Sequence, residues 1–432
     1  MPNPGDKVQI TTKKETVEGI LMPSFDNNTI ILKLETGYNI GFNKKDVAKI
    51  TLIKKAQEEH KPISPISKNP DLPTIYILHT GGTIASKVDY RTGGVVASFS
   101  PEDLIKIFPE LNSIANLHSE LISKMWSDDL RFKHFTLIAE KIEAQIKKDV
   151  NGIIIGMGTD NLAVASAALS FIIEQTPIPI LLVGSQRSSD RGSSDAALNL
   201  LSAAHLIAHS DFADVAICMH ASEQDTDCYL LPATKTYKLH SSRRDAFQPV
   251  NTLALAKINY QTKSIQFLTK DYKKRSSLKP IIKPKMEEKV GLLKIHVNMV
   301  PEQFSFFEGY KGLIIEGTGL GHTPGQVPNP ECEIHKKIYP AIKKLTQSGC
   351  VLVMTTQCLY GTVNMNVYDK GRDLLELGII SGEDMLANTA LVKLSWLLGN
   401  YKPEEVKKLI SQNLRGEINL KHQYDTEFVN IK

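Results

Sequence analysis

The sequence predicts an α/β protein preceded by a small all-β unit. Continuous apolar runs alternate with helix-length segments over most of the chain, as in a parallel sheet that is buried on both faces. Before them, short strand-like runs separated by turn residues predict a closed β-barrel. The chain has 432 residues, of which 42% are hydrophobic and 23% charged. This length allows two or three domains, and the composition excludes a mainly disordered or collagenous protein.

The predicted small β-barrel covers residues 1–55. Its five strand-like runs are DKVQIT, ETVEGILM, TIILKLE, YNIGFN and VAKITLI. Residues 56–72 are rich in proline, serine and charged side chains, which predicts a linker.

The α/β body that follows is predicted to contain two domains. The larger one, residues 73–285, holds the apolar runs TIYILHT, NGIIIGMG, PILLVGSQ and ADVAICM. Residues 262–289 are polar and basic, which predicts a hairpin plus linker and favours a solvated loop over an RNA contact. The smaller C-terminal domain, residues 290–432, continues with GLLKIHV, KGLIIEGTG and CVLVMTT.

Charge and cysteine content argue against several classes of protein. Lys plus Arg (51) nearly balance Asp plus Glu (47), so a formal net charge of +4 gives no bulk electrostatic reason to bind nucleic acid. The five cysteines form no C-x-x-C pair, which favours reduced thiols over disulfides or a zinc site. With no export signal and no long apolar run, we expect a cytoplasmic protein without a membrane span.

Three loops at predicted strand ends carry candidate chemistry, because ligands of open α/β sheets bind beyond the carboxyl ends of the strands. In TGGTIAS, the hydroxyl of Thr83 lies beside paired glycines, whose amides can approach a ligand. In MGTDN, Thr159 and Asp160 stand where a helix of small residues begins. In ATKTYKLHSSRRDAF, one of the two lysines, Lys235 or Lys238, is a candidate buried base. Taken singly, the same loops also fit a tight turn, a helix cap and a solvated loop.

Cofactor motifs are absent or incomplete in the sequence. The TGGTIAS loop has no P-loop lysine, and Gly317, Gly319 and Gly321 supply only part of a dinucleotide fingerprint. There is no H-E-x-x-H and no G-x-S-x-G. We therefore expect neither a metal nor another cofactor in this chain.

Taken in order, TGGTIAS, MGTDN and a lysine seven residues before Asp245-Ala246-Phe247 resemble the asparaginase/glutaminase family of amidohydrolases. The chain is also similar to one branch, the D subunits of archaeal glutamyl-tRNA(Gln) amidotransferases, in PGDKV, VGSQRSSDR, HSSRRDAFQ and QCLYGTVNMNVYD. The resemblance covers essentially the whole chain and implies an asparaginase-like two-domain parallel-sheet body. A plain asparaginase lacks the N-terminal barrel, and this difference separates a free-standing asparaginase from a D subunit.

The resemblance implies catalytic roles for five residues. The family's two reactive hydroxyls fall on Thr83 and Thr159, its carboxylate on Asp160, its lysine on Lys238 and an activating tyrosine on Tyr90. Two assignments of the base stay open, Tyr90 acting on Thr83 and Lys238 with Asp160 acting on Thr159. Burial lowers the pKa of a lysine whereas a nearby carboxylate raises it, so chemistry alone does not choose between them.

Three more residues are candidates for substrate binding. Ser127 is similar to the residue that grips the α-amino-acid end of the substrate in this family. Backbone amides near Gly82 and Gly158 are candidate donors to the tetrahedral oxyanion.

Three positions depart from the family pattern. Asn161 stands where a second threonine is usual, Met157 replaces a common histidine and Gly192 replaces a proline. None of them removes a nucleophile, base or carboxylate, so we expect activity to be retained and substrate preference to be affected.

The reaction implied by the resemblance is hydrolysis of the side-chain amide of glutamine or asparagine by a threonine nucleophile, with release of ammonia. In the D-subunit branch the ammonia passes to a separate E subunit, which uses ATP and Mg²⁺ to convert Glu-tRNA(Gln) to Gln-tRNA(Gln). The expected partners are therefore that subunit, tRNA(Gln) through the complex, and a second copy in a homodimer within a heterotetramer. The alternatives are a free-standing L-asparaginase or glutaminase and, from a different class, an inactive binding subunit.

The N-terminal barrel is expected to serve the assembly, because amide hydrolysis does not need it. Lys44, Lys45 and Lys49 are its candidate contact charges.

Overall fold

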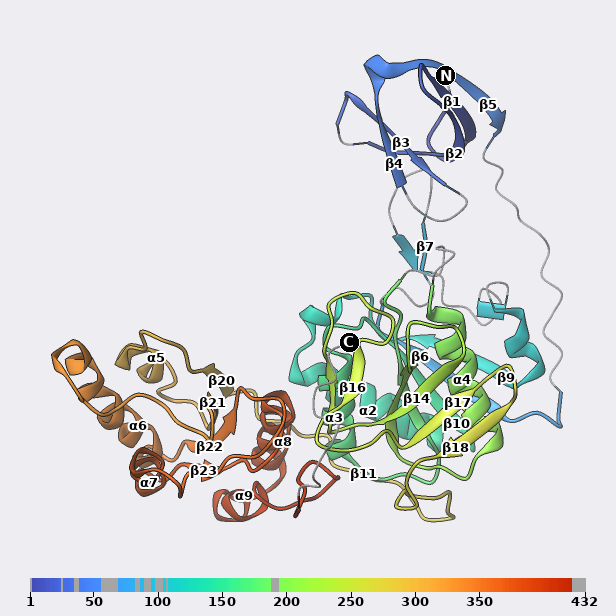
Figure 1. Cartoon of the computed structure of the whole chain (residues 1–432). Helices are drawn as coiled ribbons and strands as arrows, with labels where there is room; N and C mark the ends of the chain where they lie inside the picture. The colour runs from blue at the N-terminus through green and yellow to red at the C-terminus, as the bar shows by residue number, and fades with distance from the viewer. Residues whose placement is uncertain are drawn as a thin grey trace.

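The computed structural model describes residues 2–24, 26–34, 39–55, 69–81, 86–88, 95–97, 104–105, 108–187 and 194–421. Within these ranges the chain forms an N-terminal antiparallel sheet, a central eight-stranded sheet and a C-terminal four-stranded sheet (Figure 1). The central and C-terminal sheets carry helices, as expected for an α/β protein.

The N-terminal strands form one antiparallel sheet in the order β4-β3-β2-β1-β5. Their bounds are Lys7–Thr12 (β1), Thr16–Met22 (β2), Thr29–Lys33 (β3), Asn39–Asn43 (β4) and Val47–Lys54 (β5). Alternate side chains, among them Val8, Ile10, Leu32 and Phe42, build an apolar core that belongs to this unit alone. Because β4 and β5 are the two edges of an open sheet in the described residues, the closed barrel predicted from the sequence is not confirmed.

The central sheet is mixed, in the order β18-β17-β14-β13-β12-β10-β6-β9. Its strands are Thr74–His79 (β6), Asn116–Leu121 (β9), Gly152–Gly156 (β10), Ile180–Val183 (β12), Val215–His220 (β13), Asp227–Pro232 (β14), Ala256–Asn259 (β17) and Ser264–Phe267 (β18). The strands from β9 to β13 are parallel, and the three strands beyond β13 are antiparallel. The carboxyl ends of the parallel strands therefore meet at one edge.

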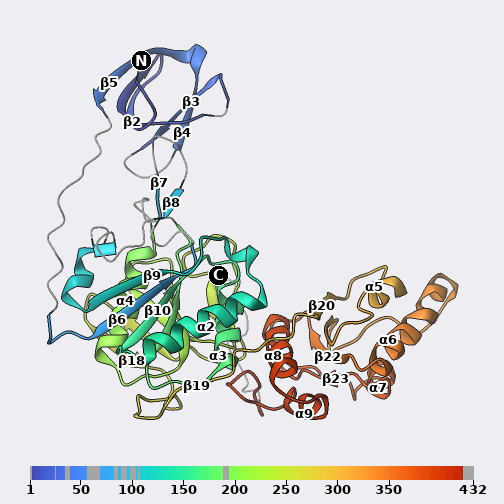
Figure 2. The same ribbon diagram turned by 180° about the vertical axis from the view of Figure 1, so that it is seen from behind.

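Helices cover both faces of this sheet, which explains its continuous apolar strands. Ile153 and Ile155 of β10 pack into the core that contains α2 and α3, whereas Ile154 packs into the core that contains α4. The helices are Phe132–Ile146 (α2), Leu162–Ile172 (α3) and Ala196–His209 (α4). Seen from behind, α2 and α3 lie along one face (Figure 2). None of the described helices is long and apolar enough to cross a bilayer.

Short strand pairs complete the large domain. They are Ser86–Val88 (β7) with Val95–Ala97 (β8), Ile173–Gln175 (β11) with Ile281–Ile282 (β19), and Thr236–Lys238 (β15) with Phe247–Pro249 (β16). Strand β11 follows α3 directly, so the chain changes from helix to strand at Ile173 to pair with β19.

The C-terminal sheet is parallel, in the order β20-β21-β22-β23. Its elements are Val290–Lys294 (β20), Pro301–Ser305 (α5), Gly312–Gly317 (β21), Ile338–Gln347 (α6), Val351–Thr356 (β22), Asp369–Glu376 (α7), Ile380–Ser381 (β23), Ala387–Asn400 (α8) and Pro403–Leu409 (α9). Helix α8 packs against α3 of the large domain, where the rings of Phe171 and Trp396 stack with centroids 5.8 Å apart. One apolar core thus continues across both sheets.

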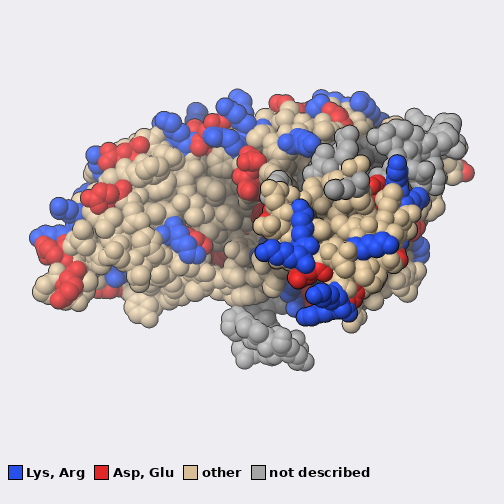
Figure 3. Space-filling model, turned by 90° about the horizontal axis from the view of Figure 1, so that it is seen from above, with Lys and Arg blue, Asp and Glu red and all other residues tan. Residues whose placement is uncertain are grey.

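The basic stretch of residues 270–285 is tied to the large domain by ion pairs. Lys273 pairs with Asp214 at 2.9 Å and Lys274 with Asp211 at 2.8 Å. The guanidinium of Arg275 donates to carbonyls at the C-terminal end of α4. On the face shown in Figure 3, basic and acidic side chains are interspersed, so neither sign forms a continuous field there.

The chain's two tryptophans offer a matched test of the shared core. Trp396 is 1% exposed, whereas Trp126 is 64% exposed. We expect Trp396→Ala to lower the free energy of unfolding by about 3–5 kcal/mol, because it opens a cavity between α3 and α8. Trp126→Ala should change it by less than about 0.5 kcal/mol. Urea denaturation followed by circular dichroism measures both, and equal shifts would contradict the packing described here.

Candidate active site

Thr159 and Asp160 lie between the end of β10 and the start of α3, at the carboxyl edge of the parallel strands. Thr159 is half-buried, and the side chain of Asp160 is 68% exposed. Gly184, just after β12, lies directly against Thr159, since a Cβ there would come within 2.8 Å of Thr159 Cγ2. Both Thr159 and Asp160 precede the first turn of α3, whose positive end favours negative charge.

Lys238 reaches this edge from the β15–β16 hairpin, in which it pairs with Phe247. Its Nζ lies 2.9 Å from Thr159 Oγ1 and 2.8 Å from Asp160 Oδ1. Its side chain is only 14% exposed. The structure therefore brings three of the residues singled out in the sequence, Thr159, Asp160 and Lys238, into direct contact.

Ser127 approaches the same site from the segment after β9. It is buried, and a Cβ on Gly158 would lie 3.0 Å from Ser127 Oγ. The absence of a side chain at Gly158 thus lets Ser127 lie close to the Thr159 loop.

The departure from the family pattern at Asn161 has a local role in the structure. Its Nδ2 donates to Ser127 O at 2.9 Å, and its backbone N donates to Ser127 Oγ at 3.4 Å. The second departure, Met157, is fully buried in the core with α2 and α3. Neither side chain blocks the contact between Lys238 and Thr159.

The first candidate loop begins beside the second. Thr80 N donates to the carbonyl of Gly156, the last residue of β10, at 3.0 Å. Gly81 has a φ of +106°, and a Cβ there would lie 2.4 Å from Met125 O, so only glycine fits. The predicted residues Gly82, Thr83 and Tyr90, and the departure Gly192, lie outside the described residues.

Two neighbouring basic residues are not equivalent to Lys238. Lys235, three positions earlier, is buried in an ion pair with Asp384 of the C-terminal domain at 2.5 Å. Burial lowers the pKa of Lys235, although Asp384 opposes that effect. Burial also lowers the pKa of His79, at the end of β6, to about 3, so that ring is neutral at pH 7.

The arrangement at Lys238 is suited to proton transfer. A base must lie about 2.6–3.2 Å from the heavy atom whose proton it abstracts, and Lys238 Nζ, 2.9 Å from Thr159 Oγ1, meets this distance. Among the described residues, no three His, Cys, Asp or Glu side chains gather closely enough to hold a metal ion.

Sequence reasoning missed a buried polar network beside this site. Asp195, which caps α4, Asn199 of α4 and His220 at the end of β13 are all at least nine-tenths buried. The signal was present, because Asp195 and Asn199 are polar residues one turn apart at the start of a largely apolar helix. His220 likewise ends a continuous apolar run.

Comparison with known proteins accounts for nearly the whole chain. Residues 74–272 match the family model "Asparaginase, N-terminal", 289–410 match "Glutaminase/Asparaginase C-terminal domain" and 2–53 match "GatD N-terminal domain". A Pyrococcus abyssi protein, named as the D subunit of glutamyl-tRNA(Gln) amidotransferase, is 41% identical, over 98% of this chain and 97% of its own length. A protein of the same name from Methanococcus maripaludis is 42% identical, over 96% of this chain and 98% of its own. The chain belongs to the family of glutamyl-tRNA(Gln) amidotransferase D subunits.

Solved structures of asparaginases share the fold of this chain. The thermostable L-asparaginase from Thermococcus kodakarensis has a TM-score of 0.70 and 27% identity, covering 81% of this chain and 100% of its own. L-asparaginase I from Vibrio cholerae has a TM-score of 0.68 and 28% identity, and it covers the same shares of the two chains. The predicted asparaginase-like α/β fold is thereby confirmed.

Proposed function

We propose that this chain hydrolyses the side-chain amide of glutamine or asparagine and supplies the ammonia for tRNA-dependent amidation. The observation that carries the proposal is the 2.9 Å contact between Lys238 Nζ and Thr159 Oγ1, with Asp160 as the second partner of the lysine. Threonine hydroxyls are weak nucleophiles that need a neighbouring base. Membership of the D-subunit family supplies the reaction that fits this pair.

In this mechanism a threonine oxygen attacks the amide carbon and forms a tetrahedral oxyanion. Backbone amides near Gly82 and Gly158 and the positive end of α3 stabilise the negative charge. The amide nitrogen leaves as ammonia after it receives a proton, and water then hydrolyses the threonyl ester. The substrate's α-amino-acid end lies near Ser127.

Two divisions of labour fit these residues. In one, Thr83 attacks with Tyr90 as its activating partner, and the Thr159–Lys238–Asp160 set moves protons. In the other, Lys238 deprotonates Thr159, which attacks directly. In both, Asp160 orients the lysine through its 2.8 Å contact with Nζ.

The proposal extends to the assembly. The ammonia passes to an E subunit that binds ATP, Mg²⁺ and Glu-tRNA(Gln), and this chain supplies no cofactor of its own. A cytoplasmic homodimer within a heterotetramer is the proposed state. We assign residues 1–55 to assembly, residues 56–72 to a linker, and residues 73–285 and 290–432 to the two domains that hydrolyse the amide.

A free-standing L-asparaginase is the second candidate. It is favoured by the solved L-asparaginases, which match this chain over their entire length. The N-terminal unit, matched by the GatD N-terminal domain model, favours the amidotransferase subunit instead.

Ammonia release from glutamine and from asparagine, with and without the E subunit and Glu-tRNA(Gln), separates the two candidates. We expect hydrolysis to rise when the partner and the charged tRNA are present. Full asparagine hydrolysis by the chain alone, unaffected by partner and tRNA, would favour the free-standing enzyme.

Thr83→Ala and Thr159→Ala should each reduce the turnover number for ammonia release by at least about 10³-fold while the protein stays folded, because each removes a nucleophile or an obligatory proton partner.

Replacement of Lys238 tests its role as a base. Lys238→Arg should lose as much activity as Lys238→Ala, because a guanidinium is not deprotonated at working pH. Single-turnover ammonia release measures the loss. Substantial activity of the arginine variant would mean that residue 238 acts as a fixed positive charge and that the base lies elsewhere.

Deletion of residues 1–70 tests the N-terminal unit. We expect the truncated chain to keep its amide hydrolysis but to form less Gln-tRNA(Gln) with the E subunit, because the N-terminal sheet has its own core and is not part of the site. Replacing Lys44, Lys45 and Lys49 together by glutamine in the full chain is the matched control for charge alone. Unchanged coupled amidation by the truncated chain would remove the assembly role.

A further inference from the structure

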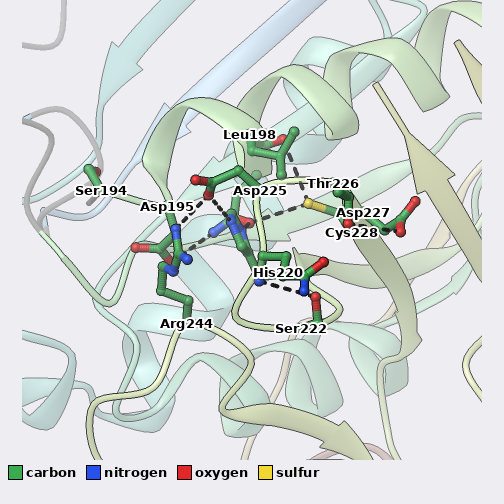
Figure 4. Close-up of polar contacts among 12 residues, drawn as sticks. Ser194, Asp195, Leu198, His220, Ser222, Asp225, Thr226, Asp227, Cys228 and Arg244 are labelled. Carbon is green, nitrogen blue, oxygen red and sulfur yellow. Dashed lines mark hydrogen bonds and ion pairs between the residues drawn. The ribbon is translucent and has the colours of Figure 1, made fainter. Parts of the chain in front are cut away.

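The hairpin that carries Lys238 is fastened to the large domain by Arg244. Although it belongs to the loop between β15 and β16, the side chain of Arg244 is only 14% exposed. Its Nη1 donates to Asp225 Oδ1 at 2.5 Å. Figure 4 shows Arg244 and Asp225 directed toward His220. The neighbouring Arg243 instead makes its close pair with Asp245 inside the same loop, and its contact with Glu223 outside the loop is longer, at 3.8 Å.

The same carboxylate oxygen joins Arg244 to a buried histidine. His220 Nε2 lies 3.2 Å from Asp225 Oδ1, and His220 Nδ1 lies 2.6 Å from Asn199 Oδ1. Asn199 Nδ2 is committed as a donor to Gly184 O, at 3.1 Å. Asn199 Oδ1 is therefore an acceptor, as is the carboxylate, so a proton on each ring nitrogen of His220 satisfies both contacts. The geometry thus favours an imidazolium at His220 between two acceptors.

The far end of this network reaches Thr159. Besides Gly184 O, Asn199 Nδ2 donates to Asp195 Oδ2 at 3.1 Å. Asp195 also accepts from Ser185 Oγ and from the backbone N atoms of residues 186 and 187. These contacts fix the segment after β12, in which Gly184 packs against Thr159. The network therefore holds both partners of the contact between Lys238 and Thr159, one from each side.

We propose that His220, Asp225 and Arg244 are positioning residues, which hold the hairpin of Lys238 at the distance from Thr159 that proton transfer requires. The catalytic consequence rests on the function proposed above, whereas the anchoring of the hairpin does not. A displacement of about 1 Å at a reacting pair costs on the order of 10² in rate, so an anchor of this kind matters.

The charge of His220 adds a pH dependence to the anchor. Burial lowers the pKa of His220, but Cys228, Asp225 and Asp195 outweigh it, so the pKa is raised above 6.5. Asn199 of α4 also contacts the ring, Cys218 of β13 contacts the carbonyl of Asn199, and Arg244 acts on the ring through Asp225. Because the folded pKa is raised, the stabilisation is complete below about pH 6.5 and is lost as the pH rises through the folded pKa.

Kinetics of Arg244→Met against Arg243→Met test the proposal. We expect Arg244→Met to lower kcat for ammonia release about tenfold to a hundredfold with little change in KM, because the residues near the substrate's α-amino-acid end are untouched. Arg243→Met, one position away, removes a 2.8 Å pair inside the loop and only a 3.8 Å contact with Glu223 outside it, so its activity should stay within about twofold. Asp225→Ala should resemble Arg244→Met, and the double variant should be no worse than either alone. Additive losses, or equal losses from the two arginine variants, would overturn the proposal.

Two measurements are independent of catalysis and so separate this inference from the proposed function. Hydrogen–deuterium exchange in residues 236–249 should become faster in Arg244→Met and not in Arg243→Met. In ¹⁵N-histidine NMR spectra, the signals that disappear in His220→Gln should show two protonated ring nitrogens at pH 6.5. Unchanged exchange in Arg244→Met or a neutral His220 at that pH would overturn the anchor, even if the chain hydrolyses amides. If exchange is faster in Arg244→Met and His220 is protonated at both nitrogens, but the chain does not hydrolyse amides, then the anchor is supported and the proposed function is wrong.

Discussion

The contact between Lys238 and Thr159 depends on a single constraint, the fixed position of the carboxyl end of β10 beside the β15–β16 hairpin. The two residues are 79 positions apart, and their atoms come within 2.9 Å only because β10 stops where the β15–β16 hairpin folds back over the edge. Strand β10 is buried on both faces, so it has no freedom to slide without exposing apolar side chains to water. The burial of isoleucines below the site thus fixes the position of polar atoms above it.

Buried charges around this edge are paired, and each pair joins different segments of the fold. Lys235 with Asp384 links the two α/β domains, and Lys393 with Glu417, both fully buried at 2.6 Å, links α8 to the chain after α9. Such pairs gain little net stability, because taking two charges out of water costs about as much as their attraction returns. Losing one partner, however, leaves a buried charge alone. The pairs therefore disfavour alternative packings of the domains more than they stabilise this one.

The asparaginase fold alone does not separate a free amidase from an amidotransferase subunit, because both have the same body. The difference lies in the N-terminal unit, which the GatD N-terminal domain model matches. That unit is an open antiparallel sheet with its own core, so its packing does not depend on the α/β body. The loop of Arg244 is different, because its ion pair with Asp225 reaches back into the body beside the site.

Sequence by itself determined the fold class, the family and the chemistry of the three loops. Apolar periodicity is a local property, and the order and spacing of TGGTIAS, MGTDN and Lys238 can be read along the chain without knowledge of the fold. It did not determine the open edges of the N-terminal sheet, because closure depends on strand twist and pairing that short runs do not encode. Nor did it give the role of Asn161 or the network of Asp195, Asn199 and His220. Those contacts join residues tens of positions apart, and a polar side chain in an apolar run acquires its partner only when helix and sheet have packed. The tertiary structure alone showed that the neighbouring Lys235 joins the two domains through Asp384.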